Sequence, residues 1–76
     1  MAPSADDALA ERELSRAIEA AIAALPERCR MVFVMSRRQG LSYAEIADAL
    51  GISVKTVEVQ IGKALRTLRE RVDMSL

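Results

Sequence analysis

Residues 41–57 constrain the fold more tightly than any other part of the chain. Ser42 and Glu45 stand at the spacing of a capping box, in which each side chain accepts a hydrogen bond from the other residue's backbone amide. An apolar stripe at helical spacing follows, made of Tyr43, Ile46, Ala47 and Leu50. Gly51 can end this helix in a left-handed conformation, and Ser53 can cap the next one. The segment therefore predicts two helices joined by a tight turn, the pattern of a helix-turn-helix.

Helical periodicity extends over most of the 76 residues. Half of them are hydrophobic and only Phe33 and Tyr43 are aromatic, so the core must be aliphatic, which suits a small helical bundle. We expect an all-α four-helix bundle as a single domain over residues 5–76, after a disordered start at residues 1–4. The helices are expected at about residues 5–24, 26–38, 43–50 and 54–72.

The apolar positions also predict which side of each helix is buried. The first helix is expected to bury Leu14, Ile18, Ala21, Ile22 and Leu25. The last helix is expected to bury Val57, Ile61, Ala64, Leu65, Leu68 and Val72. In the second helix, residues 31–35 are all apolar, which leaves no polar side there. Either this helix lies centrally in the bundle, the interpretation we prefer, or one of its faces awaits a partner.

Composition argues against catalysis, metal binding and membrane insertion. The chain has no histidine, and its single cysteine, Cys29, has no second thiol for a disulfide or a zinc site. We therefore expect no enzymatic activity, no cofactor and no metal, with Cys29 as a small buried residue. The longest apolar run is too short to span a membrane and the acidic start does not resemble a signal peptide, so a cytoplasmic location is expected.

The charges balance overall but are unevenly distributed. The formal net charge is zero, with 11 basic and 11 acidic residues. Acidic residues prevail before position 26, whereas basic residues prevail in residues 26–40 and in the last helix. A local phosphate-binding face can therefore exist within a neutral chain. In a helix-turn-helix, the second helix is the element that enters the DNA major groove.

Three stretches resemble region four of bacterial RNA polymerase sigma factors, most closely the extracytoplasmic-function group. They are residues 25–28 (Leu-Pro-Glu-Arg), 40–47 (Gly-Leu-Ser-Tyr-Ala-Glu-Ile-Ala) and 50–58 (Leu-Gly-Ile-Ser-Val-Lys-Thr-Val-Glu). The resemblance covers about residues 14–72 and implies a winged-helix-like DNA-binding fold without a wing. It also implies a module that recognises the upstream, minus-thirty-five promoter element and docks on the flap of the RNA polymerase β subunit.

The resemblance implies further expectations about partners and completeness. An anti-sigma factor is a possible additional partner. Region two, which melts promoter DNA in full-length relatives, does not fit in this chain. We therefore expect a fragment, or a standalone version, that does not start transcription by itself.

The candidate DNA-binding residues lie on the helix-turn-helix and on the outward side of the last helix. They are Arg38, Ser42, Tyr43, Ser53, Val54, Lys55, Thr56, Glu58, Val59, Gly62, Lys63 and Arg66. Ser53 and Thr56 are expected to offer hydroxyls and nearby amides to a phosphate, and Lys55 and Lys63 to contact phosphates or base edges. Gly62 can permit the close approach of another surface.

The remaining candidates are expected to distinguish bases or to hold the DNA backbone. Glu58 can accept a hydrogen bond from a cytosine amino group, and Val59 can contact a thymine methyl group. Arg38, Ser42 and Tyr43 occupy positions at which the resemblance implies contacts to the backbone across the groove. Each candidate also has a plainer interpretation as a helix cap, a solvated charge, a core tyrosine or an exposed valine.

Two other functions remain open on the sequence alone. A protein-interaction module that binds an anti-sigma factor or polymerase, with little DNA affinity, agrees with the neutral charge and the apolar second helix. The output domain of a response regulator shares the capped helix-turn-helix, although residues 25–28 favour the sigma interpretation. Self-association is also open, because removal of a natural neighbour can expose an apolar face. A steep loss of affinity with salt would identify DNA contacts.

Overall fold

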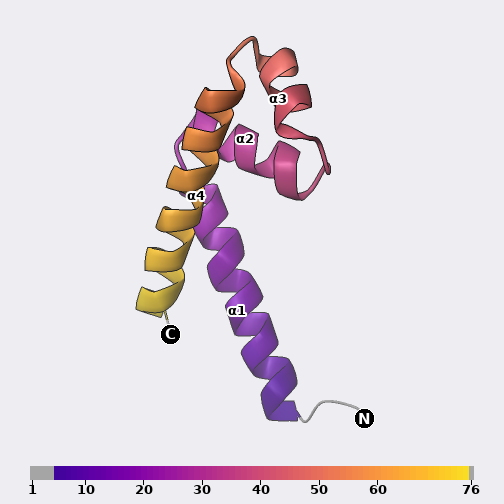
Figure 1. Ribbon diagram of the computed structural model, residues 1–76. Coiled ribbons are helices and arrows are strands. Elements are labelled where there is room, and N and C mark those ends of the chain that lie inside the picture. The colour runs from indigo at the N-terminus through magenta and orange to yellow at the C-terminus, as the bar shows by residue number, and fades with distance from the viewer. Residues whose placement is uncertain (1–4, 76) are drawn as a thin grey trace.

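The computed structural model describes residues 5–75, with side chains from residue 8 to residue 73. Its helices are α1 (Ala5–Ala23), α2 (Glu27–Arg37), α3 (Tyr43–Leu50) and α4 (Val54–Ser75), shown in Figure 1. The expected all-α, four-helix fold is confirmed. The bounds of α1 and α2 differ from expectation by one residue, and α4 continues past its expected end near residue 72. The expected disorder at residues 1–4 lies outside the described residues.

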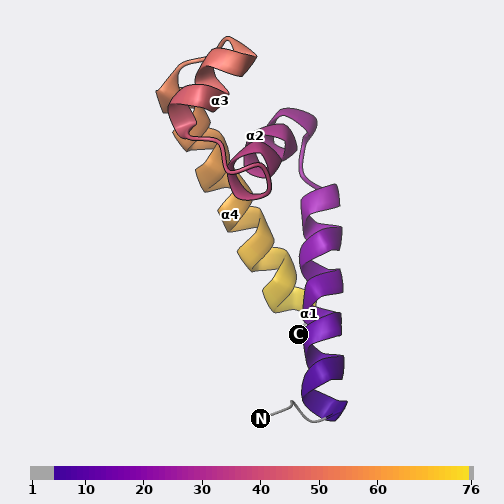
Figure 2. The same ribbon diagram turned by 90° about the vertical axis from the view of Figure 1, so that its right-hand side faces the viewer.

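Helix α4 is the element against which the other three helices pack. Figures 1 and 2 show α3 beside the beginning of α4, and the beginning of α1 at the opposite end of the molecule. The shape is elongated, with extents of 46 × 27 × 15 Å. The radius of gyration is 14.8 Å, against about 11 Å for a compact domain of this length. The helix-turn-helix end is therefore well separated from the start of α1.

Two clusters of buried side chains form the core. The basal core joins α1, α2 and α4 and consists of Ile22, Leu25, Cys29, Phe33 and Ala64. The helix-turn-helix core joins α2, α3 and α4 and consists of Val32, Ile46, Ala47, Val57 and Ile61. Val32 and Phe33 enter different clusters because successive residues of a helix point about 100° apart. Helix α2 thus links the two cores.

The apolar run in α2 divides between the interior and an open side. Val32 and Phe33 are buried, which agrees with a central position of this helix. Val34 and Met35 are half-buried, and Met31 is 40% exposed. The middle of the run fills the cores, as the central interpretation predicts, whereas Met31 faces outward, and a partner for this side stays a prediction.

Two residues that were expected in the core are exposed. Leu65 of α4 is 40% exposed, and Leu14 of α1 is 38% exposed. Leu65 lies at the margin of the apolar stripe of α4, about 80° around the helix from Val57, beyond the cover of the neighbouring helices. Leu14 precedes the part of α1 that packs into the basal core. Periodicity alone overestimated the width and length of these buried faces.

The turn between α3 and α4 depends on a left-handed glycine. Gly51 has φ 67° and ψ 35°, as the sequence predicts. The amide of Ile52 donates to the Ala47 carbonyl at 3.0 Å, and the amide of Gly51 donates to the Asp48 carbonyl at 3.4 Å, the pattern of a Schellman motif. Ile52 also packs against the helix-turn-helix core. The turn therefore sets the direction in which α4 leaves α3.

The capping box at the start of α3 is present. The amide of Glu45 donates to Ser42 Oγ at 3.1 Å, and the amide of Ser42 donates to Glu45 Oε1 at 2.9 Å. The hydrogen bonds from the backbone and hydroxyl of Ser42 lower the pKa of the Glu45 carboxyl. Two amides that have no helical acceptor are thus satisfied, and the first turn of α3 is held in place.

We expect Gly51→Val to lower the thermal midpoint by several degrees or to prevent folding. No atom would meet an added Cβ, but a residue with a side chain is forced into the left-handed region, at a cost of at least about 1–2 kcal/mol. Gly62→Ala is the matched control, because Gly62 is helical and equally unobstructed, and it is expected to keep or raise the midpoint. Thermal unfolding followed by circular dichroism measures both. An unchanged midpoint for Gly51→Val would contradict the role of this turn.

We expect Glu45→Ala to lower the thermal midpoint at neutral pH, and this loss to become smaller as the pH falls toward about pH 3. The folded-state pKa of Glu45 lies below its ordinary value of 4.5, so its stabilisation is complete above that value. The stabilisation is lost as the pH falls through the lower, folded-state pKa. Melting curves of the wild type and Glu45→Ala from neutral pH to about pH 3 show whether their midpoints approach each other. Glu45→Gln is a control that retains an oxygen acceptor in its side-chain amide. A difference that stays constant over this range would refute the role of the ionised carboxylate.

Candidate nucleic-acid interface

The outward face of α4 is positioned by the buried residues on its opposite side. Val57, Ile61 and Ala64 are buried, and they fix the rotation of the helix about its axis. The opposite side carries Lys55, Val59, Gly62, Lys63 and Arg66, all exposed. Glu58 lies toward one flank of this side and is exposed as well, and Val54 is exposed as the first residue of the helix. This face of α4 is therefore fixed in direction by the core and exposed along its length.

The first turn of α4 is capped as the sequence predicts. Ser53 Oγ accepts from the amide of Thr56 at 3.0 Å and lies 2.9 Å from Thr56 Oγ1. The hydrogen bond between the Ser53 and Thr56 hydroxyls uses the proton of one of them. The proton of the other hydroxyl is therefore available to an external acceptor. The first amides of a helix have no intrahelical acceptor and carry a partial positive charge. The cap and an anion contact are thus compatible at this helix start.

The remaining expected contacts lie around the start of α3. Ser42 is exposed and takes part in the capping box. Tyr43 is half-buried and packs against the helix-turn-helix core, so its ring is structural in part. Arg38, just after α2, is paired with Glu19 of α1, and both side chains are exposed. Arg38 is thus drawn toward another helix, which the sequence did not indicate.

A basic crevice lies between the start of α2 and the middle of α4. It has a volume of about 350 Å³ and is lined by Pro26, Arg28, Cys29, Gln60, Lys63, Arg66 and Thr67. Three of these side chains are cationic and none is acidic. Arg28 was not among the sequence candidates. The surplus of basic residues in 26–40 was a signal, but only the packing of α2 on α4 brings Arg28 near Lys63 and Arg66.

Cys29 forms the buried side of this crevice. Its thiol donates to the Gln60 carbonyl at 3.4 Å, a contact that joins α2 to α4. Burial raises the pKa of the Cys29 thiol, and the positive charge of Lys63 opposes this effect only in part. The thiol therefore stays protonated at neutral pH and acts as a small packing residue.

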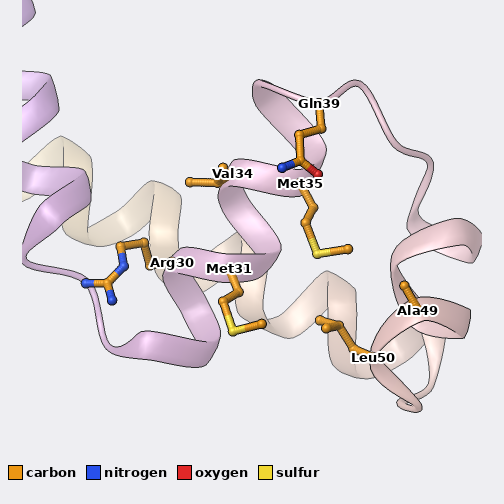
Figure 3. Close-up of a pocket in the computed structure, with 7 residues that line it drawn as sticks. All are labelled: Arg30, Met31, Val34, Met35, Gln39, Ala49 and Leu50. Carbon is orange, nitrogen blue, oxygen red and sulfur yellow. The ribbon is translucent and has the colours of Figure 1, made fainter.

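A second hollow surface, an apolar groove, lies between α2 and α3. Its volume is about 570 Å³, and it is lined by Arg30, Met31, Val34, Met35, Gln39, Ala49 and Leu50. In Figure 3, Met31 and Met35 extend from α2 into the gap, and Leu50 stands on the opposite wall. Arg30 at its rim donates to the Ala23 carbonyl at 3.2 Å, which ties α2 to the end of α1. The groove is distinct from the outward face of α4.

Other kinds of site find little support in the part of the chain that the structure describes. Over residues 5–75, no group of three or more His, Cys, Asp or Glu side chains comes together in a way that could hold a metal ion. Each helix in that range is too short or too polar to cross a lipid bilayer.

Known proteins match this chain over most of its length. The family model for sigma-70, region 4 matches residues 15–68. The ferric citrate uptake sigma factor FecI of Escherichia coli (strain K12) is 31% identical over 64 residues, which are 84% of this chain and 37% of FecI. The ECF RNA polymerase sigma factor SigW of Bacillus subtilis (strain 168) is 36% identical over 67 residues, 88% of this chain and 36% of SigW. The chain thus spans little more than a third of the length of these relatives. Because the family model covers well over half of its residues, the chain belongs to the sigma-70, region 4 family.

Proposed function

We propose that this chain is a promoter-recognition module that binds the upstream promoter element through the outward face of α4. One observation carries the proposal: the inner side of α4 is buried in both cores, while its cationic outer side is exposed. Such a helix can lie in the major groove without rearrangement. Membership of the sigma-70, region 4 family supports a DNA-binding regulatory role over that of a response-regulator output domain. The module acts by binding rather than by catalysis, and in the cytoplasm, where the chromosome lies.

Cationic and hydroxyl groups would hold the DNA backbone. Lys55, Lys63 and Arg66 extend from the outer face, and Arg28 adds a fourth positive charge from the start of α2. Phosphate contacts of this kind position a protein on DNA without selecting a sequence. Ser53 and Thr56 would place the start of α4 against a phosphate, where the helix dipole favours negative charge.

Base selection would come from Glu58 and Val59 of the same face, together with Val54 at the start of α4. Glu58 is exposed and can accept a hydrogen bond from a cytosine amino group. Val54 and Val59 are exposed apolar residues that suit thymine methyl groups, with Val59 46% exposed. The open space around Gly62 lets the helix approach the floor of the groove. Arg38, Ser42 and Tyr43 would contact the backbone on the other side of the groove, together with the α3 cap.

The apolar groove between α2 and α3 supports a second activity, docking on RNA polymerase. Met31 and Met35 are flexible, polarisable side chains that adapt to apolar partners, and here they line an open hollow. An amphipathic helix of the polymerase β flap would bury these residues while α4 remains free for DNA. An anti-sigma factor that occupied the same groove would compete with polymerase.

We expect Lys63→Ala to weaken binding to every duplex and to reduce the salt dependence of binding. Loss of one phosphate contact lowers the slope of log K against log salt by about 0.9. Fluorescence anisotropy with duplexes of selected and scrambled sequence, over a range of salt concentrations, measures both effects. Arg12→Ala removes the same charge from an exposed position on α1, outside the outer face of α4, and is expected to leave the slope unchanged.

Glu58→Ala in the same assay separates selection from affinity. We expect it to change the ranking of duplexes more than the mean affinity, because one base contact is lost while the phosphate contacts remain. Equal losses on all sequences would show that Glu58 does not select bases. A wild-type chain whose binding hardly depends on salt would refute the DNA-binding proposal as a whole.

We expect Met31→Gln to weaken binding to purified RNA polymerase core several-fold while DNA affinity stays unchanged. Met31 belongs to neither core cluster, so the substitution removes apolar groove surface without unfolding the chain. Leu9→Gln is the matched control, because Leu9 is a 55% exposed apolar residue on α1 outside the groove. Competition binding with labelled protein measures the affinity. Equal effects of the two substitutions would exclude the groove as the polymerase contact.

A further inference from the structure

One candidate DNA contact is already occupied by a carboxylate of the same chain. The Arg38 guanidinium donates through Nη2 to Glu19 Oε1 of α1. The side chains of Arg38 and Glu19 are 48% and 60% exposed, respectively. Glu19 lies in α1 and Arg38 directly after α2, 19 residues later in the sequence, so only the tertiary structure brings them together.

We propose that Glu19 is an intramolecular competitor for the phosphate that Arg38 would bind, so that α1 lowers the DNA affinity of the helix-turn-helix. The proposal rests on the DNA-binding function proposed above and adds a built-in restraint to it. A carboxylate and a phosphate oxygen accept from the same guanidinium N–H groups. While Glu19 neutralises Arg38, that position offers DNA no net positive charge.

The carboxylate is held near Arg38 by packing that does not depend on the ion pair. Ile22 of α1 is buried in the basal core, and Ile18 packs against it. Ile18 directly precedes Glu19 and Ile22 follows it by three residues, so α1 holds the carboxylate near Arg38 at a high effective concentration. Glu19 therefore stays close to Arg38 even when the ion pair is broken, and it continues to compete with a DNA phosphate.

The exposure of both side chains makes the pair exchangeable. Exposed ion pairs contribute little stability, so a DNA phosphate can displace Glu19 without unfolding α1. The cost of this displacement appears as reduced DNA affinity. Removal of the Glu19 charge is expected to tighten binding by about two- to five-fold, the range that exposed pairs of this kind support.

The test compares four variants by anisotropy on one duplex at low salt. Glu19→Gln is expected to bind about two- to five-fold more tightly than wild type. Glu11→Gln, which removes an equal charge from an exposed position earlier on α1, is the control for the general effect of net charge. Arg38→Gln alone is expected to weaken DNA binding. When Glu19→Gln is added to Arg38→Gln, the DNA affinity is expected to rise no more than it does on Glu11→Gln in the wild-type chain. Equal melting curves show that the fold is retained.

Two outcomes would overturn the inference. One is that Glu19→Gln tightens binding no more than Glu11→Gln does. The other is that the gain from Glu19→Gln persists in the Arg38→Gln background, because the carboxylate would then act without its proposed partner. Either result leaves the DNA-binding proposal intact if the wild-type chain binds with steep salt dependence. A wild-type chain that binds no duplex at low salt would refute both.

Discussion

The burial of Val32, Ile46 and Val57 is the interaction on which the rest of this structure depends. These three side chains come from α2, α3 and α4, and they are the largest that are fully buried. Their contact fixes both the angle at which α3 meets α4 and the rotation of α4 about its own axis. Because a helix is rigid over several turns, fixing one side fixes the other. The orientation of the outward face of α4 is therefore a consequence of core packing.

The long α4 helix takes part in both core clusters of the molecule. Its first half belongs to the helix-turn-helix core, and Ala64 and Leu68 in its later part pack with α1 in the basal cluster. The outward face of α4 and the apolar groove between α2 and α3 are therefore separate surfaces on one scaffold. This division agrees with a module that would contact DNA and a protein partner at the same time.

The local distribution of charge describes the surface of this chain better than its net charge does. The chain is neutral, yet Arg28, Lys63 and Arg66 gather around one crevice that has no acidic lining. Elsewhere an acidic residue of α1 reaches the arginine that follows α2. Positive charge is thus concentrated on one side of α4, whereas the positive charge of Arg38 after α2 is paired with a carboxylate. Neutral totals can hide such patterns because exposed charges act mainly over a Debye length, about 10 Å.

The sequence by itself determined the helices, the caps around α3 and at the start of α4, and the turn between these two helices, because these depend on residues that are close along the chain. Ser42 with Glu45, and Gly51 in its left-handed conformation, could be located from spacing alone. It also located most of the outward face of α4, since helical periodicity places residues around an axis. Only the tertiary structure decided where those faces end, as the exposure of Leu65 shows. It alone placed Arg28 beside Lys63 and Glu19 beside Arg38, because these contacts depend on how separate helices pack.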